Sequence, residues 1–251
     1  MSDIVTGVEA SAISVLKRAI EMDTARRFDE SLVCYQEGIN LLLQVLKVTH
    51  DQAKKDRFRQ KISEYMDRAE QLKSFVTEAK NASGTHEQIQ IEDNATGYGM
   101  EKLFSRFMTE FLTEIEIEDP YIRSHHQIYN LLRFCEVVVK NKTSVKEIKL
   151  LTGRDDNPDA QAQQHQKLDQ LKKSLHNHGI KLTVSYHDAL HDREIRFNTG
   201  WIVKIGRGLD IYKATDKFSI GFCDFDLRPC HKTTIDIFHS KSINKGKNES
   251  L

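Results

Sequence analysis

Proline and glycine, which end or bend helices, are unevenly distributed along this chain of 251 residues. All three prolines (Pro120, Pro158 and Pro229) lie after residue 119, and only Gly7 and Gly38 interrupt the first eighty residues. Proline removes a backbone donor and glycine favours turns, so both are uncommon inside helices. The distribution predicts a helical N-terminal third followed by a remainder of mixed helices and strands.

Apolar residues in the first third recur at the spacing of a helix face. The pattern predicts amphipathic helices over residues 10–24, 28–48 and 52–79, with Asp51 as the N-cap of the third. Short connections between three helices favour an antiparallel bundle, and about seventy residues can enclose a modest core without disulfides. We therefore expect an all-α three-helix domain over residues 8–80.

The remainder changes pattern after a polar stretch. Residues 81–96 are expected to form a linker, although their QIQIE segment alternates and also fits a short edge strand or a packing tether. From residue 97, starting with a predicted helix over 97–112, helical and strand-like segments alternate, which favours parallel strands. Asn198-Thr199-Gly200 predicts a hairpin, and the last apolar segments predict a strand and a short helix. We expect residues 97–251 to form an α/β domain with a mixed, largely parallel sheet.

Composition limits the classes of function. Lys plus Arg and Asp plus Glu are both 37, so the formal net charge is zero, and we expect no nucleic-acid partner. No apolar run approaches about 18 residues, and no secretory signal is visible. The cysteines form no CxxC pair, and Cys223, Cys230 and His231 fit no common zinc spacing. We expect reduced thiols, no metal and no cofactor.

The predicted third helix carries a stripe that suits a partner helix. Met66, Glu70 and Lys73 are at i, i+4 and i+7 and therefore share one face. A flexible thioether flanked by a carboxylate fits a groove that takes leucine and a basic side chain from an amphipathic helix. The alternative is that Met66 fills the core and that Glu70 and Lys73 form an ordinary surface pair.

The segments RRFDESLVCYQEGINLLLQVLK and EYMDRAEQLK resemble the MIT (microtubule-interacting and trafficking) domain. The resemblance covers residues 8–80 and implies a bundle that binds C-terminal tails of ESCRT-III subunits. In one common mode the tail is a helix in the groove between the second and third helices. The resemblance places the stripe on the third helix at positions that meet the tail. The candidate tail-binding residues are Met66, Asp67, Glu70, Lys73, Ile39 and Leu42.

The segment HDREIRFNTGWIVKIGRGLDIY resembles the phospholipase D signature, HxKxxxxD followed by a glycine-rich turn. His191 falls on the histidine, Arg193 on the lysine and Asn198 on the aspartate. Gly206 falls on the turn glycine, and Arg207 replaces the usual serine. In active members one histidine forms a covalent phosphohistidine and a second motif supplies the general acid. This chain has one motif, so the resemblance implies a homodimer.

The departures from this signature argue against catalysis. Arginine keeps the charge and binds phosphate, but asparagine lacks the carboxylate that orients the histidine. We therefore expect a catalytically weak or dead site that still binds anions. Loops after two predicted strands carry Arg123, His125, His126 and Arg154, which we expect near the same rim of the sheet; the alternative is that these residues only form solvated loops. The candidate phosphate- or lipid-binding residues are His191, Arg193, Asn198, Arg207 and Arg123.

The pairing of both domains resembles a family that acts with ESCRT-III in the abscission step of cytokinesis. The resemblance implies a C-terminal domain that dimerises on membranes, and a cytoplasmic protein peripheral at the late endosome membrane and the midbody. We expect a non-enzymatic adaptor between ESCRT-III tails and an anionic or phosphoinositide-containing membrane, with dimerisation raising avidity. The alternatives are an active dimeric phosphodiesterase that uses His191, and a protein-interaction platform with neither lipid nor catalytic role.

Overall fold

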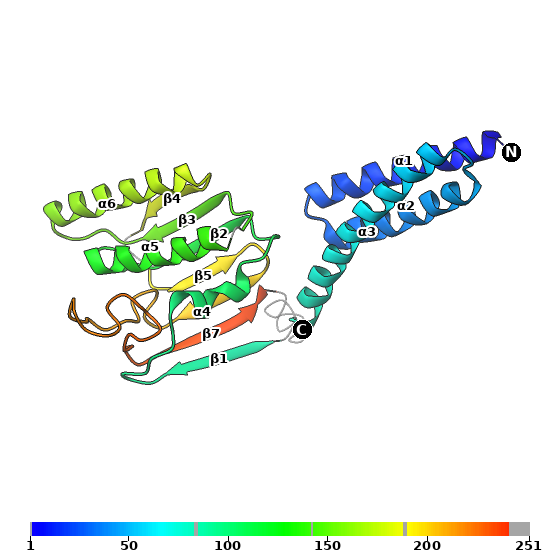
Figure 1. The fold of residues 1–251 in the computed structure, drawn as a ribbon. Coiled ribbons are helices and arrows are strands. Elements are labelled where there is room, and N and C mark those ends of the chain that lie inside the picture. Colours follow the sequence, from blue (N-terminus) through cyan, green and yellow to red (C-terminus); the bar gives the residue numbers. More distant parts are fainter. Residues whose placement is uncertain (1, 83–84, 142, 188–189, 241–251) are drawn as a thin grey trace, which may run out of the picture. The chain divides into compact units, whose positions relative to one another are not determined.

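The structure is a computed structural model that describes residues 2–82, 85–141, 143–187 and 190–240. The chain divides into two compact units, residues 1–81 and residues 82–251. Figure 1 shows helices alone in the first unit and one sheet with helices in the second. In the described residues, no helix has the length and apolar character that a membrane span requires.

Three helices form the first unit, as predicted: α1 (Ser2–Thr24), α2 (Phe28–Val48) and α3 (Gln52–Asn81). The Asp51 carboxylate accepts hydrogen bonds from the backbone N–H groups of Ala53 (2.9 Å) and Lys54 (3.2 Å). This is the geometry of an N-cap, which satisfies two of the free donors at the start of α3. The predicted capping role of Asp51 is therefore confirmed.

Helix α2 packs against both of its neighbours. Gly38 lets α1 come close, because a Cβ atom at this position would lie 2.6 Å from Cγ of Leu16. Tyr35 meets Tyr65 of α3, with ring centroids 5.9 Å apart. One row of buried side chains from each helix forms the interior, as expected for amphipathic helices. The buried apolar residues of the bundle are Ala12, Leu16, Ala19, Tyr35, Ile39, Leu42, Val45, Ile62, Ala69, Leu72 and Val76.

The second unit is built on one seven-stranded sheet with the order β1-β7-β6-β5-β2-β3-β4. The strands are β1 (His86–Ile91), β2 (Glu114–Glu118), β3 (Glu147–Thr152), β4 (Lys181–Tyr186), β5 (Glu194–Phe197), β6 (Trp201–Ile205) and β7 (Thr233–His239). The helices are α4 (Met100–Phe104), the 3₁₀ turn η1 (Ser105–Phe107), α5 (His125–Lys140) and α6 (Pro158–Asn177).

The sheet is mixed, as predicted, and its parallel part consists of β2, β3 and β4. The other pairings of neighbouring strands are antiparallel. Helices α5 and α6 provide the crossover connections that parallel strands need, whereas the predicted hairpin at residues 198–200 joins β5 to β6. The parallel share is smaller than the sequence analysis expected, because the alternation of helix and strand stops after β4.

Strand β1 lies inside the range 81–96 that was expected to be a linker. It pairs antiparallel with β7, with His86 opposite Phe238 and Ile91 opposite Thr233. Ile91 is completely buried. The structure therefore shows the edge-strand alternative, and the second unit begins at residue 82 instead of 97. In a strand with one buried face, polar residues alternate with apolar ones. The segment therefore has a polar composition overall, which is also typical of a linker.

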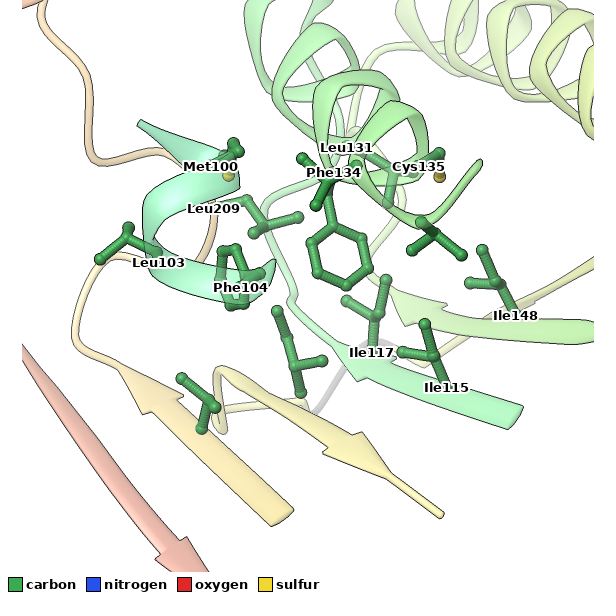
Figure 2. Close-up of a cluster of buried hydrophobic side chains, with 14 of the residues drawn as sticks. Met100, Leu103, Phe104, Ile115, Ile117, Leu131, Phe134, Cys135, Ile148 and Leu209 are labelled. Atoms are coloured by element: carbon green, nitrogen blue, oxygen red, sulfur yellow. The ribbon is translucent and has the colours of Figure 1, made fainter. Parts of the chain in front are cut away.

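The main core lies between the sheet and the helices that cover one of its faces (Figure 1). Figure 2 shows Phe104 of α4 and Phe134 of α5 above Ile115 and Ile117 of β2. The two phenylalanine rings meet edge to face with centroids 5.0 Å apart, a favoured aromatic geometry. Aromatic and aliphatic side chains thus anchor α4 and α5 on β2.

Three predicted elements differ from the structure. The segment 97–112 contains only the short helix α4 and the turn η1, instead of one long helix. Residues 206–232 contain turns and one isolated bridge between Tyr212 and Cys230, so the strand expected over residues 218–229 is absent. The short helix expected near the C-terminus is instead the strand β7. The polar tail, residues 241–251, lies outside the described residues.

Candidate functional site

An exposed stripe on α3 carries the residues expected to meet a partner helix. Met66 is 53% exposed, although the neighbouring Ala69 is buried. Glu70 and Lys73 are exposed on the same stripe, and Asp67 is exposed beside it. An exposed thioether among charged groups is suited to a partner with both apolar and charged side chains.

The stripe lies on the side of α3 that points away from α1. Arg68 donates to both carboxylate oxygens of Asp23 in α1, with N···O distances of 2.8 and 2.9 Å. Met66 precedes Arg68 by two residues, which corresponds to about 200° around an α-helix. The Met66 side chain therefore lies on the face of α3 opposite Arg68, and its place in a groove with α2 stays a prediction.

The expected contribution of α2 to this groove needs correction. Ile39 and Leu42 are only 7% and 3% exposed, so both belong to the interior of the bundle and offer little surface to a tail. Leu43, which the sequence analysis missed, is one turn after Ile39 and is 37% exposed. Apolar periodicity identifies the inward face of a helix, but it does not show where that face emerges at the surface.

The residues of the phospholipase D-like motif lie at opposite ends of β5. His191 and Arg193 precede this strand and Asn198 follows it. His191 and Arg193 line one hollow, whereas Asn198 lines another. The Asn198 amide oxygen accepts the backbone N–H of Thr113 at 3.1 Å and so ties the β5–β6 hairpin to the residue before β2. The expectation that Asn198 shares one phosphate site with His191 is therefore wrong.

His191 is exposed and lines a shallow hollow of about 440 Å³ together with Arg193 and Lys204. In the described part of the chain, no carboxylate forms a hydrogen bond with its imidazole ring. A nucleophilic histidine needs a partner that fixes its tautomer and orientation. Two carboxylates, those of Asp192 and Asp236, line the same hollow, but neither forms a hydrogen bond with the His191 ring, and Asp236 accepts one from Gln88 at 2.9 Å.

Arg193 and Arg123 come together at the ring of Tyr121. The Arg193 guanidinium lies over this ring at 4.2 Å and donates to the carbonyl of Gly206. The Arg123 guanidinium lies 5.7 Å from the same ring, and its Nε donates to the carbonyl of Pro120 at 2.8 Å. Both arginines are thus held by aromatic and backbone contacts next to the end of β2.

Asp119, which the sequence analysis did not single out, is buried directly after β2. Its carboxylate accepts the backbone N–H groups of Tyr121 (2.9 Å) and Leu209 (3.3 Å). Burial raises the pKa of this carboxyl, in opposition to the two hydrogen bonds, which lower it. Asp119 thereby fastens the turn that follows β6, and this turn carries Arg207.

A second hollow, of about 770 Å³, lies between α5 and the segment after β6, and we call it the cationic cavity. Its charged lining contains several basic side chains and one carboxylate, that of Asp210. This carboxylate already accepts a hydrogen bond from Asn130 at 3.1 Å. The Lys and Arg residues of the lining are Arg133, Arg207, Lys213, Lys217 and Arg228.

Two arginines of the cationic cavity lie on the same aromatic ring. The guanidinium carbons of Arg133 and Arg228 are 3.8 and 4.0 Å from the ring centroid of Phe225. Within the described residues, neither forms an ion pair with a carboxylate. Burial lowers the pKa of both, and the charge of Arg228 lowers that of Arg133 further. Like charges held together without a counter-charge favour the binding of an anion.

His231 belongs to the lining of the same cavity. Burial lowers the pKa of its imidazole, and the positive charges of Arg207 and Lys213 lower it further. Both effects favour the neutral form of the ring. A bound anion would act in the opposite direction and favour the protonated ring.

The structure thus separates the predicted phosphate-binding residues. Of these, only Arg207 lines the cationic cavity. The other basic residues of this cavity were not predicted, because Arg133 comes from α5 and the others from the segment after β6. Their proximity depends on how α5 docks on the sheet, and no local spacing in the sequence reveals it. The missed residues are Arg133, Lys213, Lys217 and Arg228.

Comparisons with known proteins agree with this architecture. The family model of the MIT (microtubule interacting and transport) domain matches residues 9–74. The family model described as a phospholipase D-like domain at the C-terminus of MIT matches residues 97–239, more than half of the chain. The chain is 51% identical over 236 residues to MIT domain-containing protein 1 of Mus musculus, and this match covers 94% of each chain.

Proposed function

Because the chain belongs to the family of MIT domain-containing protein 1, we propose that it is a non-enzymatic adaptor with two binding surfaces. The first is the seam between α2 and α3, which would bind C-terminal helical tails of ESCRT-III subunits. The second is the cationic cavity, which would hold an anionic membrane. The exposed Met66 stripe on an MIT domain is the observation that carries the proposal.

The chemistry of the α3 stripe defines the expected tail. A leucine of an amphipathic helix would cover Met66, which is left exposed in the free bundle. Lys or Arg side chains of the same helix would pair with Glu70 and Asp67, both of which are exposed. Such rim pairs add little affinity but select basic tails over acidic ones.

Substitution of Met66 tests the tail-binding surface. In Met66→Asp a tail must bury a carboxylate against its own leucine, which costs about 1–3 kcal/mol, so affinity should fall by about 5- to 150-fold. Fluorescence anisotropy with ESCRT-III tail peptides measures the effect. Val33→Asp is the matched control, because Val33 is 61% exposed on α2 outside the predicted tail-binding residues. Equal affinities for Met66→Asp and the unsubstituted protein would refute the assignment.

The membrane half of the proposal rests on the cationic cavity. Paired guanidiniums without counter-charges are suited to lipid phosphates, and basic groups near an anionic surface each contribute about 1 kcal/mol. Vesicle flotation should show binding to phosphoinositide-containing vesicles, weaker binding at raised salt and no binding to neutral vesicles. Arg133→Gln should weaken this binding, whereas Arg106→Gln, at an arginine that pairs with Glu87 outside the cavity, should not.

The absence of catalysis is part of the same proposal. It is supported by the exposed His191 without a carboxylate partner among the described residues and by the structural role of Asn198 at the hairpin. An active phosphodiesterase would show turnover that His191→Ala abolishes, together with a phosphohistidine on His191. We expect neither in assays with lipid or nucleic-acid phosphodiesters.

The proposal extends to assembly and place of action. A homodimer formed through the second unit would present two tail-binding surfaces to a polymer that carries many tails, and avidity would follow. The protein would be cytoplasmic and would reach the midbody and the late endosome membrane through these tails. In dividing cells, Met66→Asp should therefore remove a fluorescently tagged protein from the midbody without lowering its abundance.

A further inference from the structure

The segment between β6 and β7 presents apolar side chains to solvent. Phe218 is fully exposed and Ile220 is 81% exposed, the two highest values for large apolar side chains among the described residues. Figure 1 shows this segment in orange, projecting beyond the strands at one end of the sheet. Isolated apolar residues are common on surfaces, but two at the apex of one projecting segment suggest a binding function. We call Phe218 and Ile220 the apolar tip.

Hydrogen bonds hold the apolar tip in a defined conformation. The N–H of Ser219 donates to the carbonyl of Asp216 at 3.0 Å, and the N–H of Phe222 donates to the carbonyl of Ser219 at 3.1 Å. Arg228 donates to the carbonyls of Gly221 (2.6 Å) and Phe222 (2.5 Å). The tip is therefore a turn stabilised by hydrogen bonds, and it loses little conformational freedom when it binds.

The apolar tip and the cationic cavity are parts of one surface. Arg228, which braces the turn after the tip, also lines the cavity, as do Lys217 and Phe222 on either side of the tip. Two apolar side chains thus lie next to a cavity in which basic side chains outnumber the one carboxylate, that of Asp210. The interfacial region of an anionic membrane offers the complementary order, with phosphates outside and hydrocarbon a few ångströms further in.

We propose that the apolar tip inserts into the membrane when lipid phosphate occupies the cationic cavity. This inference rests on the proposed membrane binding and adds an apolar contribution that salt does not screen. Phe218 and Ile220 enter the boundary between head groups and acyl chains, while Lys217 extends its ammonium group back to the phosphates. A second copy of this chain is a poorer occupant, since a symmetric contact would bring two cationic cavities together.

Flotation of the full chain with anionic vesicles, at low and raised salt, tests the insertion. The double variant Phe218→Ser/Ile220→Ser should partition at least about tenfold more weakly, because two large apolar side chains no longer leave water. Its residual binding should keep the salt dependence of the cationic cavity. The matched control is Val33→Ser/Val48→Ser, which removes two exposed apolar side chains of the first unit and should bind like the unsubstituted chain.

The variant Phe218→Trp measures directly how deeply the apolar tip enters the membrane. Brominated acyl chains should quench this tryptophan in anionic vesicles more strongly than they quench Trp201, the only tryptophan of the unsubstituted chain, which lies in β6. An unchanged Trp201 unfolding transition shows that each variant is folded.

Three results would overturn the inference. Equal partitioning of the tip variant and the unsubstituted chain would reject insertion while leaving the proposed membrane binding intact. A tip variant with a changed oligomeric mass in solution would identify the tip as a contact between copies. No flotation of the unsubstituted chain would reject the membrane half of the proposed function, and the insertion with it.

Discussion

At the scale of single residues, the turn after β6 requires glycine at position 208, because this residue has no Cβ atom. Its φ of +61° lies in the left-handed region, and a Cβ atom would overlap the buried Asp119 carboxylate. Gly208→Ala adds backbone strain and a steric clash and should lower the free energy of unfolding by about 2–5 kcal/mol. Urea unfolding followed by Trp201 fluorescence measures the loss.

Gly179 provides the matched control for this prediction. Its φ is +74°, but a Cβ atom added there would meet no other atom within 4 Å, so Gly179→Ala costs backbone strain alone. The strain at such a position is about 1 kcal/mol for alanine. Equal losses for the two variants would show that Asp119 moves away easily and does not fix the turn.

Some residue-level properties could be predicted from the sequence, and the reasons are physical. The stripe of Met66, Glu70 and Lys73 follows from helical spacing alone, and the structure places all three at the surface. Asp119 could not be predicted, because its importance depends on the approach of Leu209 from a segment ninety positions later. The separation of His191 from Asn198 was predictable from the rise of a strand, but the motif resemblance suggested one common site.

At the scale of elements, local periodicity predicted the long helices and most strands, whereas boundaries depended on distant partners. The sequences of α2, α5 and α6 are amphipathic or carry capping residues, so these helices can be predicted from local sequence alone. Strand β1 is different, because its assignment depends on pairing with β7, almost 150 residues away. The short α4 likewise depends on Phe104 packing against Phe134 of α5.

The pairing of β1 makes a prediction about truncation. A chain that starts at residue 97 lacks β1, so the backbone of β7 and the core around Ile91 lose their cover. We expect residues 97–251 to aggregate or to unfold at markedly lower urea concentration, because an exposed edge strand pairs with other chains. Residues 82–251 should remain soluble and unfold cooperatively, and size-exclusion chromatography with urea titration distinguishes the two.

A point substitution in β1 separates the contribution of its buried side chain from the effect of shortening the chain. A variant of residues 82–251 with Ile91→Ser keeps the length but removes the buried side chain, and should lie between the two truncations in stability. If residues 97–251 were as stable as residues 82–251, β1 would be an accessory strand and the boundary at 97 would be correct.

At the scale of the whole molecule, the two units have separate interiors. The main buried cluster contains side chains from Ile91 onwards, while the bundle has its own core of residues from α1, α2 and α3. Trp201 is the single tryptophan of the chain, and its ring centroid lies 5.8 Å from that of Phe107 in the second unit. Its fluorescence therefore reports the unfolding of that unit, whereas far-ultraviolet circular dichroism reports helices of both.

Separate interiors predict that each ligand stabilises one unit. A tail peptide at about 100 times its Kd should stabilise the bundle by about 2.7 kcal/mol, which raises its melting temperature by about 10 °C or more. The Trp201 transition should stay in place with the peptide and rise with a soluble phosphoinositide head group. In the proposed adaptor, each ligand would bind its own unit, and without coupling neither would change the transition of the other unit. A peptide that shifted the Trp201 transition would instead show coupling between the units, so that tail binding would regulate membrane binding.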